Sequence, residues 1–283
     1  MKIILTGNQG FIGRNLEEEL IGQGHDVIGF DVASENGCSV DEIKNAMDGV
    51  SVILHQGAIT DTLYPDNIAM MKYNYEFSKE LFDAAFKRRI KVVYASSAAC
   101  YGNDNTQETP ANIYGWSKYC AEQYGLALYK PEIVGESTGI VPQFIALRYY
   151  NVFGPGEEQK GKMSSVAYQA MERGEMVLFP GKPKRDFVYV KDVVSANIHA
   201  MNNKYIKTDF YDVGSGVASS FEDVCDAVGI SYTHTTEDKI PVGYQFWTES
   251  DRRKWLPGWK PKYDLTTALK EYKEHFTEMN SYV

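Results

Sequence analysis

Short apolar runs alternate with longer amphipathic segments through the first half of the chain. Five runs are apolar almost throughout and read as buried strands: 2–6, 26–31, 51–56, 91–96 and 143–148. Helical periodicity predicts helices between them, over 11–23, 40–47, 67–88 and 114–129. Alternation of this kind indicates a parallel sheet with helices on both faces, so we expect a doubly wound α/β fold.

Beyond Asn151 the pattern breaks into pieces separated by glycine and proline. These pieces favour a smaller, irregular lobe that follows the parallel sheet. The segment from Asp186 to Met201 reads as a strand followed by a helix and is expected to return to the first unit. We therefore predict a core domain over 1–150 and about 184–206, and a smaller lobe over about 151–183 and 207–283.

Composition narrows the class of protein without changing that fold. A chain of 283 residues with 43% hydrophobic and 24% charged positions can bury a full core, as one α/β unit or as a core with a lobe. Its net charge of −9 argues against holding nucleic acid or an anionic membrane by its overall field. The first apolar run is too short for a signal peptide or a membrane span, so a cytoplasmic protein is expected.

The cysteines indicate no special chemistry. There are four, far apart and without a CxxC pair, which predicts neither a metal site nor a disulfide framework.

A glycine-rich turn follows the first predicted strand directly. Gly7, Gly10 and Gly13 stand at GxxGxxG spacing and open a helix pattern. The first permits a tight turn, the second lets the backbone approach a pyrophosphate, and the third allows close packing of helix on strand. The helix N-terminus would face the phosphates. A plain tight turn is the alternative, but the place in the first βα unit favours a dinucleotide site of the Rossmann type.

Asp31 bears on which dinucleotide binds. It ends the second predicted strand, where an acidic side chain meets the ribose of a dinucleotide. A carboxylate accepts hydrogen bonds from both ribose hydroxyls and repels a 2′-phosphate, and the following residues, 32–35, contain no arginine or lysine. NAD is favoured, with NADP kept as a possibility.

A YxxxK pair marks the candidate catalytic centre. Tyr114 and Lys118 stand one helical turn apart at the start of a predicted helix, so we expect the lysine to lower the pKa of the phenol. A phenolate so placed is a general base for a hydroxyl proton. The sequence contains a second such pair, Tyr75 with Lys79. It lies inside a longer helix pattern and away from any strand end, so we interpret it as a surface pair without a catalytic role.

Ser97 follows the strand 91–96, at the carboxyl edge where open sheets bind their ligands. Its hydroxyl can share a proton network with Tyr114. A serine that only caps a helix is the alternative. The presence of the glycine-rich turn, Asp31 and the YxxxK pair in the same sequence favours a functional role for Ser97.

Several motifs together resemble the extended short-chain dehydrogenase/reductase family over nearly the whole chain: GNQGFIG, HQGA, YASSAACYG, YGWSK, RYYNVFGP and KRDFVYVKD. The resemblance implies a Rossmann domain that binds NAD(P) and a carboxyl-side lobe that binds a sugar nucleotide. It places the catalytic trio on Ser97, Tyr114 and Lys118. Stretches such as QKGKMSSVAYQ and YQFWTESD are most similar to the branch of epimerases that act on carbon 6 of an ADP-linked heptose.

In that branch a second lysine serves as an acid/base group, and the matching residue is Lys160; a solvated loop lysine is the alternative. The resemblance also implies a homo-oligomer that makes precursors of surface polysaccharide such as lipopolysaccharide. Cofactor contacts are implied at Gly7, Gln9, Gly10, Phe11, Ile12, Gly13, Asp31, Gln56, Ala58, Asn74, Tyr114 and Lys118. Substrate contacts are implied at Ser97, Asn151, Lys160, Arg185 and Tyr244.

Two departures from the family pattern bear on binding. Gly243 replaces an arginine expected near the substrate phosphates, so the base or diphosphate pocket is expected to differ. The stretch between Asp31 and Val40 leaves little room for a regular third strand and its adenine contact.

Other activities are weighed against this reading. A dehydratase would need an acidic pair where Ala98 and Ala99 stand. A UDP-hexose 4-epimerase uses the same trio and is the main alternative. A non-catalytic NAD-binding protein is a further alternative, but it would not need to keep the YxxxK pair, which is present here.

Overall fold

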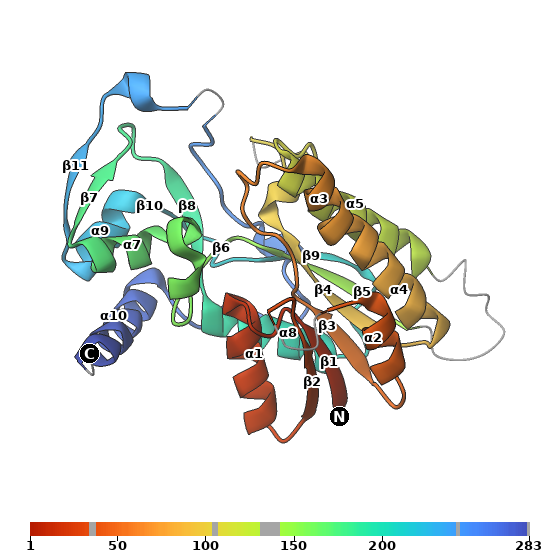
Figure 1. The fold of residues 1–283 in the computed structure, drawn as a ribbon. Helices are drawn as coiled ribbons and strands as arrows, with labels where there is room; N and C mark the ends of the chain where they lie inside the picture. Colours follow the sequence, from red (N-terminus) through yellow and green to blue (C-terminus); the bar gives the residue numbers. More distant parts are fainter. Residues whose placement is uncertain (34–37, 104–106, 131–141, 242–243, 282–283) are drawn as a thin grey trace.

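The computed structural model describes residues 1–33, 38–103, 107–130, 142–241 and 244–281. Six parallel strands form its central sheet, in the order β2-β1-β3-β4-β5-β9 (Figure 1). They are β1 (Lys2–Thr6), β2 (Asp26–Phe30), β3 (Val52–His55), β4 (Lys91–Ser97), β5 (Phe144–Tyr149) and β9 (Asp209–Val213). The five strands predicted from the sequence are all present, and the doubly wound fold is confirmed.

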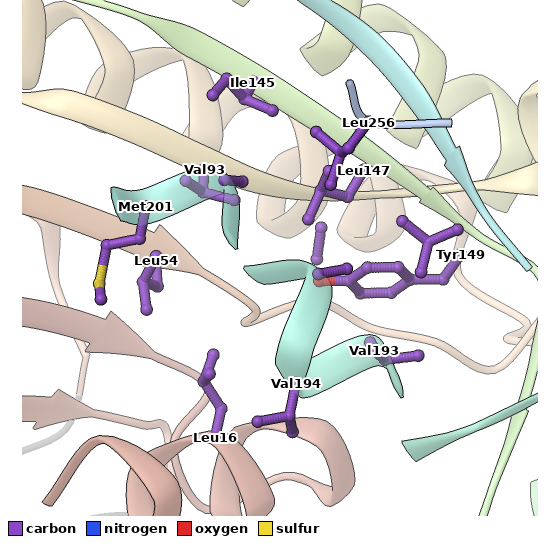
Figure 2. Close-up of a cluster of buried hydrophobic side chains, with 14 of the residues drawn as sticks. Leu16, Leu54, Val93, Ile145, Leu147, Tyr149, Val193, Val194, Met201 and Leu256 are labelled. Atoms are coloured by element: carbon purple, nitrogen blue, oxygen red, sulfur yellow. The ribbon is translucent and has the colours of Figure 1, made fainter. Parts of the chain in front are cut away.

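Helices cover both faces of this sheet. On one face lie α1 (Phe11–Gly22) and α8 (Val190–Asn202), and on the other α2 (Val40–Ala46), α4 (Phe77–Lys87) and α5 (Ile113–Leu128). Figure 2 shows the first interface, where Leu16 of α1 and Val193 of α8 belong to one buried cluster with Leu54 and Leu147 of the sheet. Burying each such side chain contributes about 1.5–3 kcal/mol, which holds the strand ends in place.

The segment predicted as one helix over 67–88 is divided into three parts. These are α3 (Asn67–Met71), a π-helical turn η1 (Lys72–Glu76) and α4. The wider turn carries Asn74, which is buried and bonds the backbone of Ile59 with its amide oxygen and nitrogen, at 2.8 and 2.9 Å. Helical periodicity does not reveal such a turn, because π-helical turns are short insertions that distant contacts stabilise.

A smaller lobe, formed by segments from the carboxyl half of the chain, lies beside the central sheet (Figure 1). Its three-stranded sheet joins β10 (Ala218–Ser220), β8 (Lys184–Tyr189) and β6 (Asn151–Phe153), and a second pair joins β7 (Glu175–Leu178) with β11 (Ser231–His234). Three helices, α7 (Val166–Arg173), α9 (Phe221–Val228) and α10 (Leu265–Ser281), pack on these strands around a core of their own. Short 3₁₀ turns are η2 (Ala98–Cys100), η3 (Glu158–Met163), η4 (Glu237–Lys239) and η5 (Arg252–Lys254).

Two strands lie on the other side of the predicted division. β9 comes from the range assigned to the lobe, yet it pairs with β5 in the central sheet. β8 comes from the range assigned to the core, yet it belongs to the lobe sheet, while α8 after it packs on the core as predicted. The chain thus returns to the core at α8 and leaves it again after β9, so both boundaries lie later in the sequence than predicted. Treating them as separate domains stays a prediction.

The opposite edge of the central sheet is β2. Among the residues with described structure, no further strand pairs with it. Residues 34–37, in the stretch expected to be too short for a further strand, lie outside the described residues, so that expectation stays a prediction. Of the helices in the described ranges, none is long and apolar enough to cross a membrane.

Candidate active site

The glycine-rich turn is built by close approach of two loops at the carboxyl ends of β1 and β3. Gly7 has a positive φ of 70°, and a Cβ added there would stand 2.5 Å from the Gly57 backbone nitrogen. A Cβ on Gly13 would stand 1.9 Å from the Gly7 carbonyl oxygen. Only glycine therefore fits at either position, and α1 begins directly behind the turn with its N-terminus toward the sheet edge.

Asp31 is fixed beside this turn by backbone donors. Its Oδ2 accepts a hydrogen bond from the Gln9 nitrogen at 3.2 Å and its Oδ1 accepts from the Ala33 nitrogen at 3.0 Å. At the N-terminus of α1, Gly10 has no side chain to cap the first N–H groups, which leaves them for an anion. Uncapped backbone N–H groups with a carboxylate beside the same turn suit the adenosine diphosphate half of NAD.

Ser97, Tyr114 and Lys118 come together at the carboxyl end of β4. α5 starts after Asn112, whose side chain accepts from the Gly115 nitrogen and caps the helix, so Tyr114 lies in its first turn. The Tyr114 hydroxyl lies within hydrogen-bonding reach of Ser97. The Ser97 Oγ also accepts from the Ala99 nitrogen at 3.1 Å, so the capping role and the contact with Tyr114 coexist.

The predicted lowering of the phenol pKa is wrong for this structure. Burial raises the pKa of Tyr114 to about 12, and the hydrogen bond from Ser97 only partly opposes that rise. Lys118 is almost fully buried, and burial lowers the pKa of its ammonium to about 8. Its Nζ lies 4.4 Å from the centre of the Tyr94 ring. Desolvation of both groups outweighs the attraction that the YxxxK spacing suggests.

Two residues predicted to contact the cofactor have their side chains turned into the protein. The Gln56 amide accepts from the Tyr149 hydroxyl at 3.0 Å and donates to Asn197 at 3.0 Å. Asn74 holds the backbone of Ile59, as described above. Both side chains therefore shape the loop after β3, which includes Ala58, and direct cofactor contacts by them stay a prediction.

Lys160 lies on the turn η3, against the glycine-rich turn. Its Nζ is 5.1 Å from the Phe11 ring centre and 4.0 Å from the carboxylate of Glu157. The neighbouring Gln159 donates to the Gln9 carbonyl at 3.0 Å, which joins the two turns. Burial lowers the pKa of Lys160, and Glu157 opposes that effect. Within the described part of the chain, no hydrogen bond, ion pair or ring contact joins Lys160 to Tyr114.

The predicted substrate residues Arg185 and Tyr244 come together on the lobe. The Arg185 guanidinium lies 5.3 Å from the Tyr244 ring centre and 5.6 Å from that of Phe221, and it is 9% exposed. Asn151, predicted with them, is exposed at the start of β6. The departure at Gly243 lies outside the described residues. The result is a shielded cation among aromatic rings, suited to a phosphate or a base.

Sequence reasoning missed several buried polar groups that hold this site. Glu122 of α5 pairs with Arg148 of β5 at 2.5 Å, both side chains are fully buried, and Ser96 donates to the same carboxylate at 2.6 Å. His55 and Glu157 are likewise fully buried. The available signal was a charged or polar residue inside an otherwise apolar run, which marks a bonded group but does not name its partner.

Comparison with known proteins identifies the family to which the chain is similar. The model of the NAD dependent epimerase/dehydratase family matches residues 3–214. An ADP-L-glycero-D-manno-heptose-6-epimerase of Brachyspira hyodysenteriae is 32% identical, with 99% of each chain covered. The Helicobacter pylori crystal structure of the enzyme with that name has a TM-score of 0.83 at 26% identity and covers 98% of this chain and 96% of its own.

A Thermotoga maritima UDP-glucose 4-epimerase, solved with UDP-glucose, has a TM-score of 0.82 at 24% identity and covers 99% of this chain and all (100%) of its own. That likeness shows the fold alone. The family match and the full-length relative go further, and the chain belongs to the NAD-dependent epimerase/dehydratase family.

Proposed function

We propose that the protein is an ADP-L-glycero-D-manno-heptose 6-epimerase, which inverts carbon 6 of the sugar by transient oxidation and re-reduction. The observation that carries the proposal is the approach of Tyr114 to Ser97, with Lys118 one helical turn further on over the Tyr94 ring, together with Lys160 held against the glycine-rich turn. Relatives of that name that match over the full chain support the choice of substrate.

Tyr114 is the group suited to exchange a proton with the sugar hydroxyl. Its phenol is half-buried and lies within reach of the Ser97 hydroxyl, which can orient both the phenol and the substrate hydroxyl. Lys118 lies one turn further along the same helix. Burial lowers the pKa of its ammonium, and while protonated this group can stabilise the phenolate as that forms. NAD, when bound, supplies the reversible two-electron acceptor that transient oxidation requires.

Lys160 is suited to act as the second acid/base group. Epimerisation requires the transient carbonyl to present its other face, and a proton donor on a different element from Tyr114 can serve that face. Lys160 comes from η3, on the lobe side of the glycine turn, while Tyr114 comes from α5. Its lowered pKa makes the ammonium a better proton donor than a solvated lysine.

Binding of the nucleotide is proposed for the lobe. Arg185, shielded and flanked by the Tyr244 ring, can pair with a diphosphate far more strongly than an exposed arginine. On the cofactor side, Asp31 favours NAD over NADP because its carboxylate would face a 2′-phosphate. A homo-oligomer and a cytoplasmic location remain part of the proposal.

Incubation with sugar nucleotides, followed by proton NMR of the sugar, tests the proposal. With ADP-D-glycero-D-manno-heptose the wild-type protein is expected to produce the 6-epimer, and Lys160→Met to lose that activity. Lys162→Met is the matched control, since Lys162 is an exposed lysine on the same turn. Conversion of UDP-glucose to its 4-epimer, with the heptose unchanged, would overturn the proposal in favour of the rival activity.

A further inference from the structure

A network of hydrogen-bonded, buried polar side chains lies beneath the site, and His55 is at its centre. His55 is the last residue of β3 and is 0% exposed. Its ring packs among the aromatic rings of Phe77, Phe82 and Tyr94, with ring centres 5.9, 5.8 and 5.5 Å away. A histidine in such surroundings needs a partner for both ring nitrogens, and both have one.

The partners determine which nitrogen carries the proton. The Ser78 hydroxyl donates to the Asn74 carbonyl at 2.6 Å, and this uses its one proton. Its 2.8 Å contact with His55 Nε2 is therefore a hydrogen bond donated by the ring. In a neutral imidazole Nδ1 is then the acceptor, and it receives the Thr6 hydroxyl at 2.5 Å.

A positive charge on this ring is disfavoured independently of that geometry. Burial, together with the nearby Lys118 ammonium, lowers the pKa of His55 to about 3. A second ring proton would also face Thr6, whose oxygen already accepts from the Gly57 nitrogen at 3.2 Å. The neutral ring protonated on Nε2 is the form that fits the hydrogen bonds of both Thr6 and Ser78.

Both ends of this hydrogen-bond network reach the site. Thr6 directly precedes the glycine-rich turn and lies opposite His55 in the β1–β3 pairing. At the other end, the Asn74 amide donates to the Ser117 hydroxyl at 3.0 Å, and Ser117 donates to the Tyr114 carbonyl at 2.7 Å. The hydrogen bonds thus connect the cofactor turn, the loop after β3 and the first turn of the catalytic helix.

We propose that His55 is a positioning residue for the reaction: as a neutral ring protonated on Nε2, it holds the glycine-rich turn and the helix that carries Tyr114 in one fixed arrangement. The inference rests on the proposed function, since it concerns the placement of that function's catalytic tyrosine. It assigns His55 no contact with substrate or cofactor.

The first test reads the tautomer directly. In protein labelled with ¹⁵N-histidine, NMR at pH 7 is expected to show His55 with Nε2 protonated and Nδ1 bare. A ring protonated on Nδ1, or a charged one, would overturn the inference. This readout requires neither NAD nor a sugar substrate, so it is independent of the proposed activity.

The second test asks whether the two ends of the hydrogen-bond network are energetically coupled. His55→Phe keeps an aromatic ring in the pocket and removes both hydrogen bonds, and Ser117→Ala breaks the far end. Each is expected to weaken NAD binding and to lower kcat, and the double variant is expected to fall short of the product of the two effects by about tenfold. His55→Gln, which can still donate to Ser78, is expected to recover part of the loss.

A control cycle pairs Ser117→Ala with Tyr129→Phe. Tyr129 belongs to the hydrophobic cluster that contains Phe82 and Tyr94. Its buried hydroxyl donates to the Ile90 carbonyl at 3.2 Å and is not part of the network around His55. Those two effects are expected to multiply. If the His55 cycle on NAD affinity multiplies as well, His55 is merely a packed core residue and the inference fails. If NAD affinity couples while no sugar nucleotide turns over, the proposed function fails instead.

Discussion

Replacing Glu157 by glutamine is expected to alter how activity depends on pH, because Glu157 holds the turn that carries Lys160. The Glu157 carboxylate is fully buried and accepts from the Gly154 nitrogen at 3.2 Å, the Ser165 nitrogen at 2.6 Å and the Ser165 hydroxyl at 2.7 Å. Its nearer oxygen also lies 4.0 Å from the Lys160 ammonium. One substitution therefore removes an anchor and a charge.

Two magnitudes follow from this geometry. A unit charge 4 Å away interacts with about 1 kcal/mol in water and about 4 kcal/mol at an effective dielectric constant of 20, and half-buried Lys160 lies between these limits. The amide nitrogen of glutamine would also face a backbone donor, which costs about 1–3 kcal/mol of folding free energy. Burial already lowers the pKa of Lys160 and Glu157 opposes that effect, so removing the carboxylate lowers the pKa further.

The assay is kcat as a function of pH, with urea unfolding beside it. The limb of the profile that reports Lys160 is expected to move to lower pH in Glu157→Gln. Glu158→Gln is the matched control, since Glu158 is exposed on the same turn, and its profile should match the wild type. A Glu157→Gln profile that superimposes on the wild type, whatever the loss of stability, would show that Glu157 does not set the pKa of Lys160.

Three further outcomes are expected. Tyr114→Phe should lower kcat by about 10² to 10⁴ while NAD still binds, as measured by turnover and by titration with NAD. Gly7→Ala should introduce about 1–3 kcal/mol of backbone strain at a positive φ and press a Cβ against Gly57, weakening NAD binding in the same titration. Arg148→Met should leave Glu122 buried without its partner and reduce the free energy of unfolding in urea by about 3–5 kcal/mol.

Local pattern was sufficient for the central sheet and for the glycine-rich turn. Runs of apolar residues identify strands buried on both faces, and the tight turn of Gly7 depends on residue types that are close in sequence. The trio Ser97, Tyr114 and Lys118 could be found for the same reason, because two of its members share one helix and the third ends a strand.

Properties that depend on distant contacts could not be read from the pattern. β9 is an edge strand of mixed polarity, so its pairing with β5 is decided by the fold and not by its own residues. The pKa of Tyr114 depends on how deeply the helix is buried, which spacing does not show. The partners of His55 lie on other elements, 23 and 49 residues away in the sequence.

The central claim is that carbon 6 of the sugar is inverted by oxidation and re-reduction within the site. Epimerisation of ADP-D-glycero-D-manno-heptose in D₂O, followed by NMR, tests it most directly. We expect an inverted product without deuterium at carbon 6, because the hydrogen removed from that carbon returns to it without exchanging with water. Deuterium at carbon 6 of the product would contradict the account, since it would show that the carbon exchanges a proton with the solvent.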